Sequence, residues 1–449
     1  MASPLGRAKL ISVPVSPARQ LARDVLLAVE AGGYAADLLH SQRARGLSLA
    51  DRRLATELVM GVLRWRAQLD FVIVQAARRA IDNIPLLPRT ALRLGAYQLR
   101  FLDRVPAMAA VHESVEMTKA ESPRAAGFVN AVLRHLPRAP MAALVGAEAD
   151  LRRRREAEFS HPAWLLERWS RNFGPRAAAA IAEYNNQPPP TAIWPPLDPV
   201  PAGISILPGQ LLRSAARVAA GDVTKLEVFR QGNLWVQDEA SQLVAALLAP
   251  QGFDQVLDVC AAPGGKTARV AALAPTARVV ALELHPRLAA LLQRRLRGAI
   301  PVVIADAAAL PVRGPFDRIL VDAPCTGTGT LARNPEIRWR LTPTDPARLA
   351  QLQGRILRSA AASLAPRGRM VYSVCSLEPE EGPQVVEALL AADPGLELLP
   401  AGEVLTGMRE AGELLTEPGR ITEGPYLRIL PGAFASDGFF AAVVRRRAG

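Results

Sequence analysis

Apolar residues in the first third of the chain recur at steps of three and four positions, which is the spacing of one face of an α-helix. The clearest series is Leu54, Leu58, Val59, Val62 and Leu63. Comparable series run from Ala18 to about Leu136, so we expect several consecutive helices that pack as an all-α bundle.

The pattern changes after Leu226, where short runs rich in apolar and β-branched side chains alternate with helical stretches rich in Ala and Leu. The runs are Val256–Cys260, Val279–Leu284, Val302–Ala305, Arg318–Val321, Met370–Val374 and Phe439–Val444. Strands that alternate with helices are typical of parallel βαβ units. We therefore expect an α/β, Rossmann-like domain with a doubly wound sheet.

A polar and proline-rich segment separates these two parts. The basic run from Arg152 to Arg155 is interpreted as a solvated helix face rather than a phosphate site. Prolines between Pro188 and Pro201 are too frequent for a helix to continue. We expect three domains: the bundle at 15–140, a connector that forms a small extension of the last domain at 141–225, and the α/β domain at 226–449.

Charge and composition narrow the class of protein. The formal net charge is +12, which favours a polyanionic partner, but almost all of the positive charge is Arg in an Ala-rich chain, so charge alone does not establish nucleic-acid binding. No apolar run approaches the roughly 20 residues that span a bilayer. The first residues have no apolar signal core, so we expect a cytoplasmic protein that does not enter membranes.

The cysteines and histidines do not suggest a metal or a disulfide framework. Three cysteines are too few for such a framework, and no CxxC or HxxxH pair offers metal-ligand spacing. We therefore expect no metal.

Four strand ends carry polar or glycine-rich segments. Residues Val256–Thr267 read VLDVCAAPGGKT, a strand that breaks at Pro-Gly-Gly and resumes as a helix, without the spacing of a dinucleotide or P-loop fingerprint. The next expected strands end at Glu283, Asp306 and Asp322. Ligands of open α/β sheets bind outside the carboxyl ends of the strands, and an acidic residue at the position of Glu283 holds ribose hydroxyls.

Two cysteines follow the expected strands Arg318–Val321 and Met370–Val374. Cys325 and Cys375 each come directly after an apolar strand, whereas Cys260 is interpreted as a small buried residue. If the two strands are neighbours in the sheet, their ends lie about 5 Å apart and both thiols face one pocket. Two thiols at such a crevice indicate covalent catalysis rather than a disulfide.

These segments together resemble a known family. The motifs DAPCTGTG, SVCS, CAAPGGKT and DGFF resemble those of RNA 5-methylcytosine methyltransferases of the Nol1/Nop2/Sun family; they stand at Asp322–Gly329, Ser373–Ser376, Cys260–Thr267 and Asp437–Phe440. Three further segments resemble the RsmB/Sun-type branch, the bacterial 16S rRNA enzymes with a NusB-like N-terminal domain. They are QDEAS at Gln237–Ser241, YNNQPPP at Tyr184–Pro190 and GFVNAVLR at Gly127–Arg134. The resemblance extends from about Ala18 to Arg446.

The resemblance implies S-adenosyl-L-methionine as cofactor and an RNA-binding role for the NusB-like domain. The implied cofactor-binding residues are Cys260, Ala261, Ala262, Pro263, Gly264, Gly265, Lys266, Glu283 at the ribose, Asp306 near the adenine, and Asp322. Cys375 is implied as the nucleophile and Cys325 as the residue that assists product release. The chain departs mildly from the family at Val374, Thr326 and Glu283, and none of these departures removes a reacting group.

The implied reaction accounts for the residue types. C5 of cytosine is a poor nucleophile, so a thiolate first adds to C6, and Asp322 is placed to bond the base edge and stabilise the shifted charge. A base stacked in a helix cannot reach a thiol, so the target is single-stranded or flipped. DNA cytosine-C5 enzymes lack the second cysteine, and amino-methylating enzymes carry an Asn/Asp-Pro-Pro-Tyr segment that Asp322–Cys325 does not match.

The leading hypothesis is thus C5 methylation of a cytosine in small-subunit rRNA by a monomer. The same chemistry on a tRNA cytosine stays open, because the catalytic half does not specify the RNA. A non-catalytic RNA-binding or ribosome-assembly factor is the alternative from another class. A small-molecule methyltransferase fits poorly, because a simple methyl acceptor needs no covalent adduct.

Overall fold

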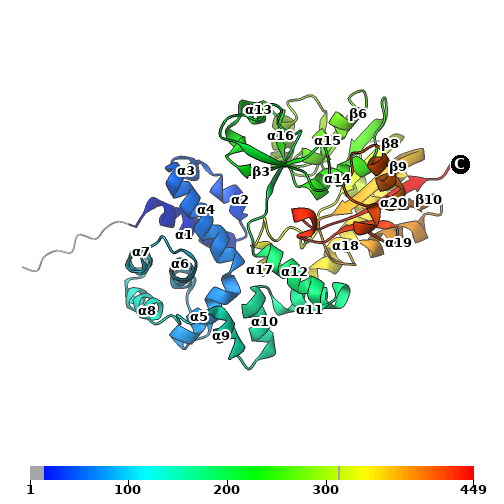
Figure 1. Cartoon of the computed structure of the whole chain (residues 1–449). Helices are drawn as coiled ribbons and strands as arrows, with labels where there is room; N and C mark the ends of the chain where they lie inside the picture. Colours follow the sequence, from blue (N-terminus) through cyan, green and yellow to red (C-terminus); the bar gives the residue numbers. More distant parts are fainter. Residues whose placement is uncertain (1–14, 312–313, 449) are drawn as a thin grey trace, which may run out of the picture. The chain divides into compact units, whose positions relative to one another are not determined.

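The computed structural model describes residues 15–311 and 314–448, which divide into two compact units (Figure 1). The helical unit contains the described residues up to Glu167 together with Asn334–Trp339. The sheet unit contains Arg168–Arg333 and the described residues from Arg340 onward. The expected boundaries at 140 and 225 do not coincide with this division. The first part of the expected connector joins the helical unit, because Gln68 donates to the carbonyl of Glu158 and the amide of Ala67 donates to the Ser160 hydroxyl.

The helical unit is the expected all-α bundle. Its helices are α1 (Pro17–Glu30), α2 (Ala35–Leu39), α3 (Gln42–Arg45), α4 (Leu49–Arg64), α5 (Arg66–Ala77), α6 (Leu86–Phe101), α7 (Ala107–Lys119), α8 (Pro123–Arg134), α9 (Met141–Gly146) and α10 (Leu151–Phe159). The predicted apolar series is confirmed on α4, where Leu58, Val59, Val62 and Leu63 are buried in the core of the bundle. Arg93 is buried in this core and forms ion pairs with Asp70 and Glu30.

One short segment of the helical unit comes from far along the sequence. Asn334–Trp339, which includes most of α17 (Ile337–Arg340), groups with the bundle although it lies between two strands of the sheet unit. The indole of Trp339 donates to the carbonyl of Leu63 at 2.7 Å, and Glu336 accepts from the amide of Ala35 at 3.0 Å. No pattern in the sequence predicts this placement.

The sheet unit begins with two helices and a small antiparallel sheet. The helices are α11 (Ala163–Phe173), which begins in the helical unit, and α12 (Pro175–Asn185). The sheet has the order β2-β3-β1-β4, with β1 (Thr191–Trp194), β2 (Ser205–Pro208), β3 (Ala216–Ala220) and β4 (Trp235–Val236). The proline-rich run is interrupted by β1: its first three prolines precede that strand, and the later ones lie in the loop between β1 and β2. Trp194 and Trp235 stack on each other at the β1–β4 pair.

The main sheet has nine strands, with the order β11-β12-β13-β9-β8-β5-β6-β7 and β10 beside β13. The parallel strands are β5 (Gln255–Asp258), β6 (Arg278–Glu283), β7 (Val302–Ile304), β8 (Phe316–Asp322) and β9 (Leu364–Val374). The antiparallel strands are β10 (Leu396–Leu399), β11 (Thr422–Glu423), β12 (Tyr426–Ile429) and β13 (Phe439–Arg446). The expected strands are thus all present.

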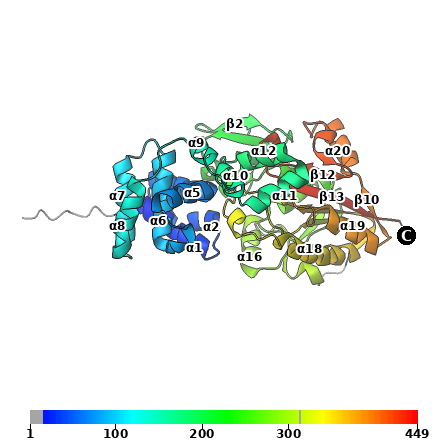
Figure 2. The same ribbon diagram turned by 90° about the horizontal axis from the view of Figure 1, so that it is seen from below.

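Helices cover both faces of this sheet, as expected for a doubly wound fold. One face packs against α14 (Glu239–Leu247), α15 (Gly265–Leu273), α16 (Pro286–Arg295) and α20 (Ala401–Glu410). The other packs against α18 (Asp345–Ala362) and α19 (Pro383–Ala392). Figure 2 shows α20 on one side of β12 and β13, and α18 and α19 on the other side. The connection between β12 and β13 is short, so these two strands pair antiparallel, and β13 is also antiparallel to β9.

Of the described helices, none combines the length and the apolar character that crossing a bilayer requires.

Candidate active site

The carboxyl ends of the parallel strands form a crevice where the strand order reverses. From β5 the chain proceeds to β6 and β7 on one side, then returns to β8 and β9 on the other side. The loops after β5 and β8 therefore diverge at this point, which is where open α/β sheets bind ligands. The Pro-Gly-Gly turn, the acidic strand ends and the two cysteines Cys325 and Cys375 lie at these strand ends.

The Pro-Gly-Gly turn connects β5 to α15. Gly264 has φ +104°, a backbone conformation that side chains disfavour, and its amide donates to the carbonyl of Ala261 at 2.8 Å. A Cβ on Gly264 would lie 2.8 Å from a methyl group of Leu292. The amide of Ala261 in turn bonds the carbonyl of Leu282 on β6. The turn is therefore held close to the neighbouring strand, and α15 begins at Gly265 facing the crevice.

A small cavity of about 100 Å³ lies against this turn. It is lined by Trp235, Val236, Gln237, Ser241, Asp258, Cys260–Pro263, Gly265, Lys266, Arg295 and Asp322. Gln237 is held by two hydrogen bonds, since it accepts from the indole of Trp194 and donates to Ser241. The small sheet therefore contributes one wall of the crevice, which the sequence did not predict.

The acidic strand ends have different local partners. Asp258 is buried, accepts a hydrogen bond from Thr267, and burial raises its pKa to about 7. Glu283 accepts from the amide of His285 at 2.9 Å, and Asp306 accepts from the amide of Ala308 at 2.8 Å. Both carboxylates therefore act as local caps, and each has a second oxygen for a ligand.

Cys325 and Cys375 are brought together as the sequence predicts. β8 and β9 are parallel neighbours, with Asp322 opposite Ser373. The two sulfur atoms lie 3.4 Å apart, within hydrogen-bond distance. The hydrogen bond to Cys375 and then burial raise the pKa of Cys325 well above its usual range. Either thiol can be the donor in this contact.

Asp322 is held by two donors beside the thiols. The ammonium of Lys266 lies 2.7 Å from Oδ2, and the hydroxyl of Ser373 lies 2.8 Å from Oδ1. Burial opposes the charge of Lys266, but the Asp322 carboxylate outweighs it and raises the lysine pKa. Lys266 is also close enough to Cys375 for its charge to interact with that thiol.

Cys260 behaves as a different kind of cysteine. Burial, followed by the neighbouring carboxylates Asp258 and Asp322, raises its pKa well above the usual range. Cys260 is only partly buried and lines the cavity, so its interpretation as a fully buried residue does not hold. In the described part of the chain, no group of three or more His, Cys, Asp and Glu side chains is arranged to hold a metal ion.

Sequence reasoning missed two polar contributors to this site. Ser373 lies inside the SVCS segment, and its place opposite Asp322 follows only from the strand register. Glu381 lies in the acidic run Glu378-Pro379-Glu380-Glu381, and its carboxylate is fully buried behind the cysteines. Glu378 of the same run is also fully buried, but it bonds Arg168 and Trp169, and the sequence does not show which glutamate faces the cysteines.

Comparisons with known proteins agree across most of the chain. Residues 245–445 match the family model described as 16S rRNA methyltransferase RsmB/F, and residues 16–138 match the NusB family. The "Probable ribosomal RNA small subunit methyltransferase B" of Bacillus subtilis is 33% identical over 96% of this chain and 98% of its own. The "Ribosomal RNA small subunit methyltransferase B" of Sodalis glossinidius is 34% identical over 88% of this chain and 90% of its own.

Solved structures share the fold at lower identity. The structure titled "Crystal Structure of PH0851" has a TM-score of 0.79 with 21% identity and covers 97% of this chain and 100% of its own. The structure of NSun6 from Pyrococcus horikoshii with SFG has a TM-score of 0.54 with 19% identity and covers 64% of this chain and 99% of its own.

Proposed function

Because this chain belongs to the RsmB/F family of small-subunit rRNA methyltransferases and carries a NusB-family domain, we propose that it methylates C5 of a cytosine in 16S rRNA. The observation that supports this chemistry most directly is the pair of thiols, 3.4 Å apart, next to the Lys266–Asp322 ion pair. Methylation of an oxygen or an amino group requires no such pair, because those acceptors are nucleophilic themselves.

The residues around the crevice have the chemistry to hold S-adenosyl-L-methionine. The lining offers the open N-terminus of α15 for a carboxylate and the stacked Trp235 as an apolar wall. Gly265 has no side chain, so the carboxamide of Gln237 can lie close to its backbone; a Cβ there would be 3.2 Å from that carboxamide. We assign the backbone of 260–266 to the amino-acid end of the cofactor, Glu283 to the ribose and Asp306 to the adenine side. When bound, the cofactor supplies an electrophilic methyl group on a sulfonium.

Cys375 is the proposed nucleophile. Its thiolate adds to C6 of the cytosine, which makes C5 electron-rich enough to accept a methyl group. Asp322 is fixed by Lys266 and Ser373, so it can bond the base edge without reorganising as charge shifts toward N3. Lys266 balances the negative charge of the thiolate before attack.

Cys325 is the proposed releasing residue. After transfer, the C5 proton must leave and the bond between C6 and the Cys375 sulfur must break. Cys325 lies within hydrogen-bond distance of that sulfur, so Cys325 as a thiolate, or a water that it positions, can accept the C5 proton. The electron pair of the C5–H bond then re-forms the C5–C6 double bond and expels the Cys375 thiolate. The two cysteines thereby have separate tasks.

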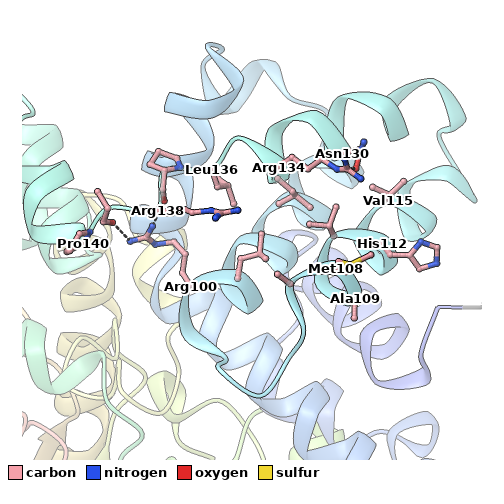
Figure 3. A pocket seen from close by; sticks show the side chains of 16 residues that line it. Arg100, Met108, Ala109, His112, Val115, Asn130, Arg134, Leu136, Arg138 and Pro140 are labelled. Atoms are coloured by element: carbon pink, nitrogen blue, oxygen red, sulfur yellow. Dashed lines mark hydrogen bonds between the residues drawn. The ribbon is translucent and has the colours of Figure 1, made fainter.

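The helical unit offers a surface for the RNA. A groove of about 1220 Å³ lies among α6, α7, α8 and the segment after α8, and Figure 3 shows Arg100, Arg134 and Arg138 around it. Its lining contains no acidic residue, and Met108 at its edge is 86% exposed. Arg100 binds the carbonyls of Pro137 and Ala139, and Arg134 donates through Nε to Asn130. The terminal nitrogens of Arg134 and the guanidinium of Arg138 are the groups that we assign to phosphates. We propose this groove as one RNA contact.

The test is transfer of tritiated methyl from S-adenosylmethionine to unmethylated small-subunit rRNA and, in parallel, to total tRNA, followed by nucleoside analysis. We expect the label in rRNA as 5-methylcytidine. Label in tRNA alone would keep the chemistry and overturn the substrate. No label in either RNA, without cofactor binding, would favour a non-catalytic assembly factor.

A further inference from the structure

Behind the two cysteines lies a buried carboxylate that the proposed reaction does not use. Glu381 follows β9 by seven positions and is 0% exposed. Burying a charged group is costly unless it is fully hydrogen-bonded, so its partners indicate why the position carries a glutamate.

The partners of Glu381 lie next to the two cysteines. Thr326, which follows Cys325, donates to the carboxylate through its amide at 2.9 Å and through its hydroxyl. Ser376, which follows Cys375, donates its hydroxyl to the same oxygen as the Thr326 hydroxyl. The two hydroxyl oxygens are 3.0 Å apart. One carboxylate therefore connects the loop after β8 to the loop after β9.

A second set of buried groups holds Glu381 in place. Gln353 of α18 donates to its carboxylate at 3.0 Å and to the carbonyl of Pro324, the residue before Cys325, at 2.9 Å. The Tyr372 hydroxyl contacts both Gln353 and the backbone carbonyl of Glu381. Gln353 and Tyr372 are both fully buried. The carboxylate thus has little freedom to move, and neither do the loops that it joins.

An ionised carboxylate suits this place because it only accepts hydrogen bonds. Its partners include an amide N–H and a side-chain NH₂, which cannot reverse their direction, and a buried N–H left without an acceptor is costly. Burial raises the pKa of Glu381, and the bonds from Ser376 and Thr326 oppose that change. Charge-assisted hydrogen bonds are also stronger than neutral ones, so the connection is stiff.

We propose that Glu381 is a positioning residue that fixes the distance between the Cys325 and Cys375 sulfur atoms by joining the two cysteine loops through Thr326 and Ser376. The inference rests on the proposed function, because the division of labour between the thiols gives that distance its importance. In the described part of the chain, the hydrogen bonds of Glu381 go to the residue that follows each cysteine, and its charge also acts directly on Cys325.

The test measures how strongly the reactivity of the Cys375 thiol depends on the presence of Cys325. Iodoacetamide alkylation of each cysteine is followed by mass spectrometry across the neutral and alkaline pH range, in the full chain with and without Cys325→Ala. In the wild-type background, we expect removal of Cys325 to change the rate of Cys375 alkylation about threefold or more and to shift its pH profile. In the Glu381→Gln background, the same removal should have little effect.

Matched variants separate the connection from general damage. Thr326→Val and Ser376→Ala each remove one hydroxyl, fill nearly the same space and should each weaken the coupling, whereas Thr326→Ser keeps the hydroxyl and should preserve it. Glu380→Gln is the control for charge, because the neighbouring Glu380 pairs with Arg168 and not with the cysteine loops. If Glu381→Gln does not fold, the hydroxyl variants still test the connection.

Methyl transfer supplies the second readout. We expect Glu381→Gln to lower kcat about tenfold or more, with the KM for S-adenosylmethionine unchanged. Coupling that persists in Glu381→Gln, or in both Thr326→Val and Ser376→Ala, would overturn the inference. Alkylation needs no substrate, so a chain that fails to methylate RNA while its thiol coupling depends on Glu381 would contradict the proposed function alone.

Discussion

At the scale of single residues, the electrostatics of the site depend on the position of one buried ammonium group, that of Lys266. The resemblance implies that Lys266 binds the cofactor. In the structure, its ammonium donates to Asp322 at 2.7 Å. Its side chain is 12% exposed, so its charge is poorly screened by water. The ammonium therefore stabilises the Asp322 carboxylate, and it is close enough to act on Cys375 in the proposed reaction.

This placement predicts the effect of Lys266→Met, which keeps the length of the side chain and removes its charge. We expect kcat for methyl transfer to fall about 100-fold, because a preorganised charge at the reacting centre is lost. Cofactor affinity measured by calorimetry should change far less. Lys225→Met, at an exposed lysine, is the matched control. A parallel loss of cofactor affinity would instead make Lys266 a cofactor ligand.

The residue scale also shows what a sequence can predict about a site. Cys325 and Cys375 were recognisable because each follows a strand, and a parallel register fixes how strand ends align. Glu381 was not recognisable, because burial and the direction of a side chain depend on packing against α18, which no local pattern encodes.

At the scale of elements, the cofactor crevice depends on a turn with an unusual backbone. Gly264 combines φ +104° with a close approach to Leu292, so two independent constraints exclude a side chain there. The strand before it and the helix after it were predictable from their periodicities, and the turn from Pro-Gly-Gly. The contribution of Gln237 to the cavity was not predictable, because Gln237 follows β4 of the small sheet and not a strand of the main sheet.

Gly264→Ala tests this element. We expect loss of stability of about 1–2 kcal/mol from the left-handed backbone, and in addition a loss of cofactor affinity of about tenfold or more as the turn shifts away from Leu292. The comparison is Gly298→Ala, where φ is +68° and no atom lies within 4 Å of the added Cβ. Equal cofactor affinity in the two variants, measured beside their thermal melts, would contradict this role of the turn.

Elements that join distant parts of the chain were the hardest to predict. The sequence indicated strands at all six positions, but it did not indicate that Phe439–Arg446 runs antiparallel beside β9. Nor did it indicate that Asn334–Trp339 groups with the helical unit. Both placements depend on connections and tertiary contacts, not on the period of the residues that make them.

At the scale of the whole molecule, the net charge of +12 is distributed over two units. Two basic features stand out in the helical unit: the groove with Arg134 and Arg138, and the run Arg152–Arg155 on α10. In the run, Arg152 and Arg153 face Glu156 and Asp150, as expected for a solvated helix face. The groove lining has no such acidic partner.

The salt dependence of RNA binding distinguishes these two features. Each arginine that neutralises a phosphate contributes about one unit to the slope of log affinity against log salt. We expect the double variant Arg134→Gln with Arg138→Gln to reduce that slope by about two. The double variant Arg152→Gln with Arg153→Gln should leave it nearly unchanged. A reversed result, read by filter binding to small-subunit rRNA, would place the RNA on α10 instead.

The division of labour between the thiols is the central claim, and a denaturing gel tests it most directly. Unmethylated small-subunit rRNA and S-adenosylmethionine are incubated with Cys325→Ala, with Cys375→Ala and with the double variant. We expect Cys325→Ala alone to accumulate protein covalently joined to RNA, because the adduct forms at Cys375 and is not released. An adduct in Cys375→Ala, or loss of activity without any adduct in both single variants, would contradict the account.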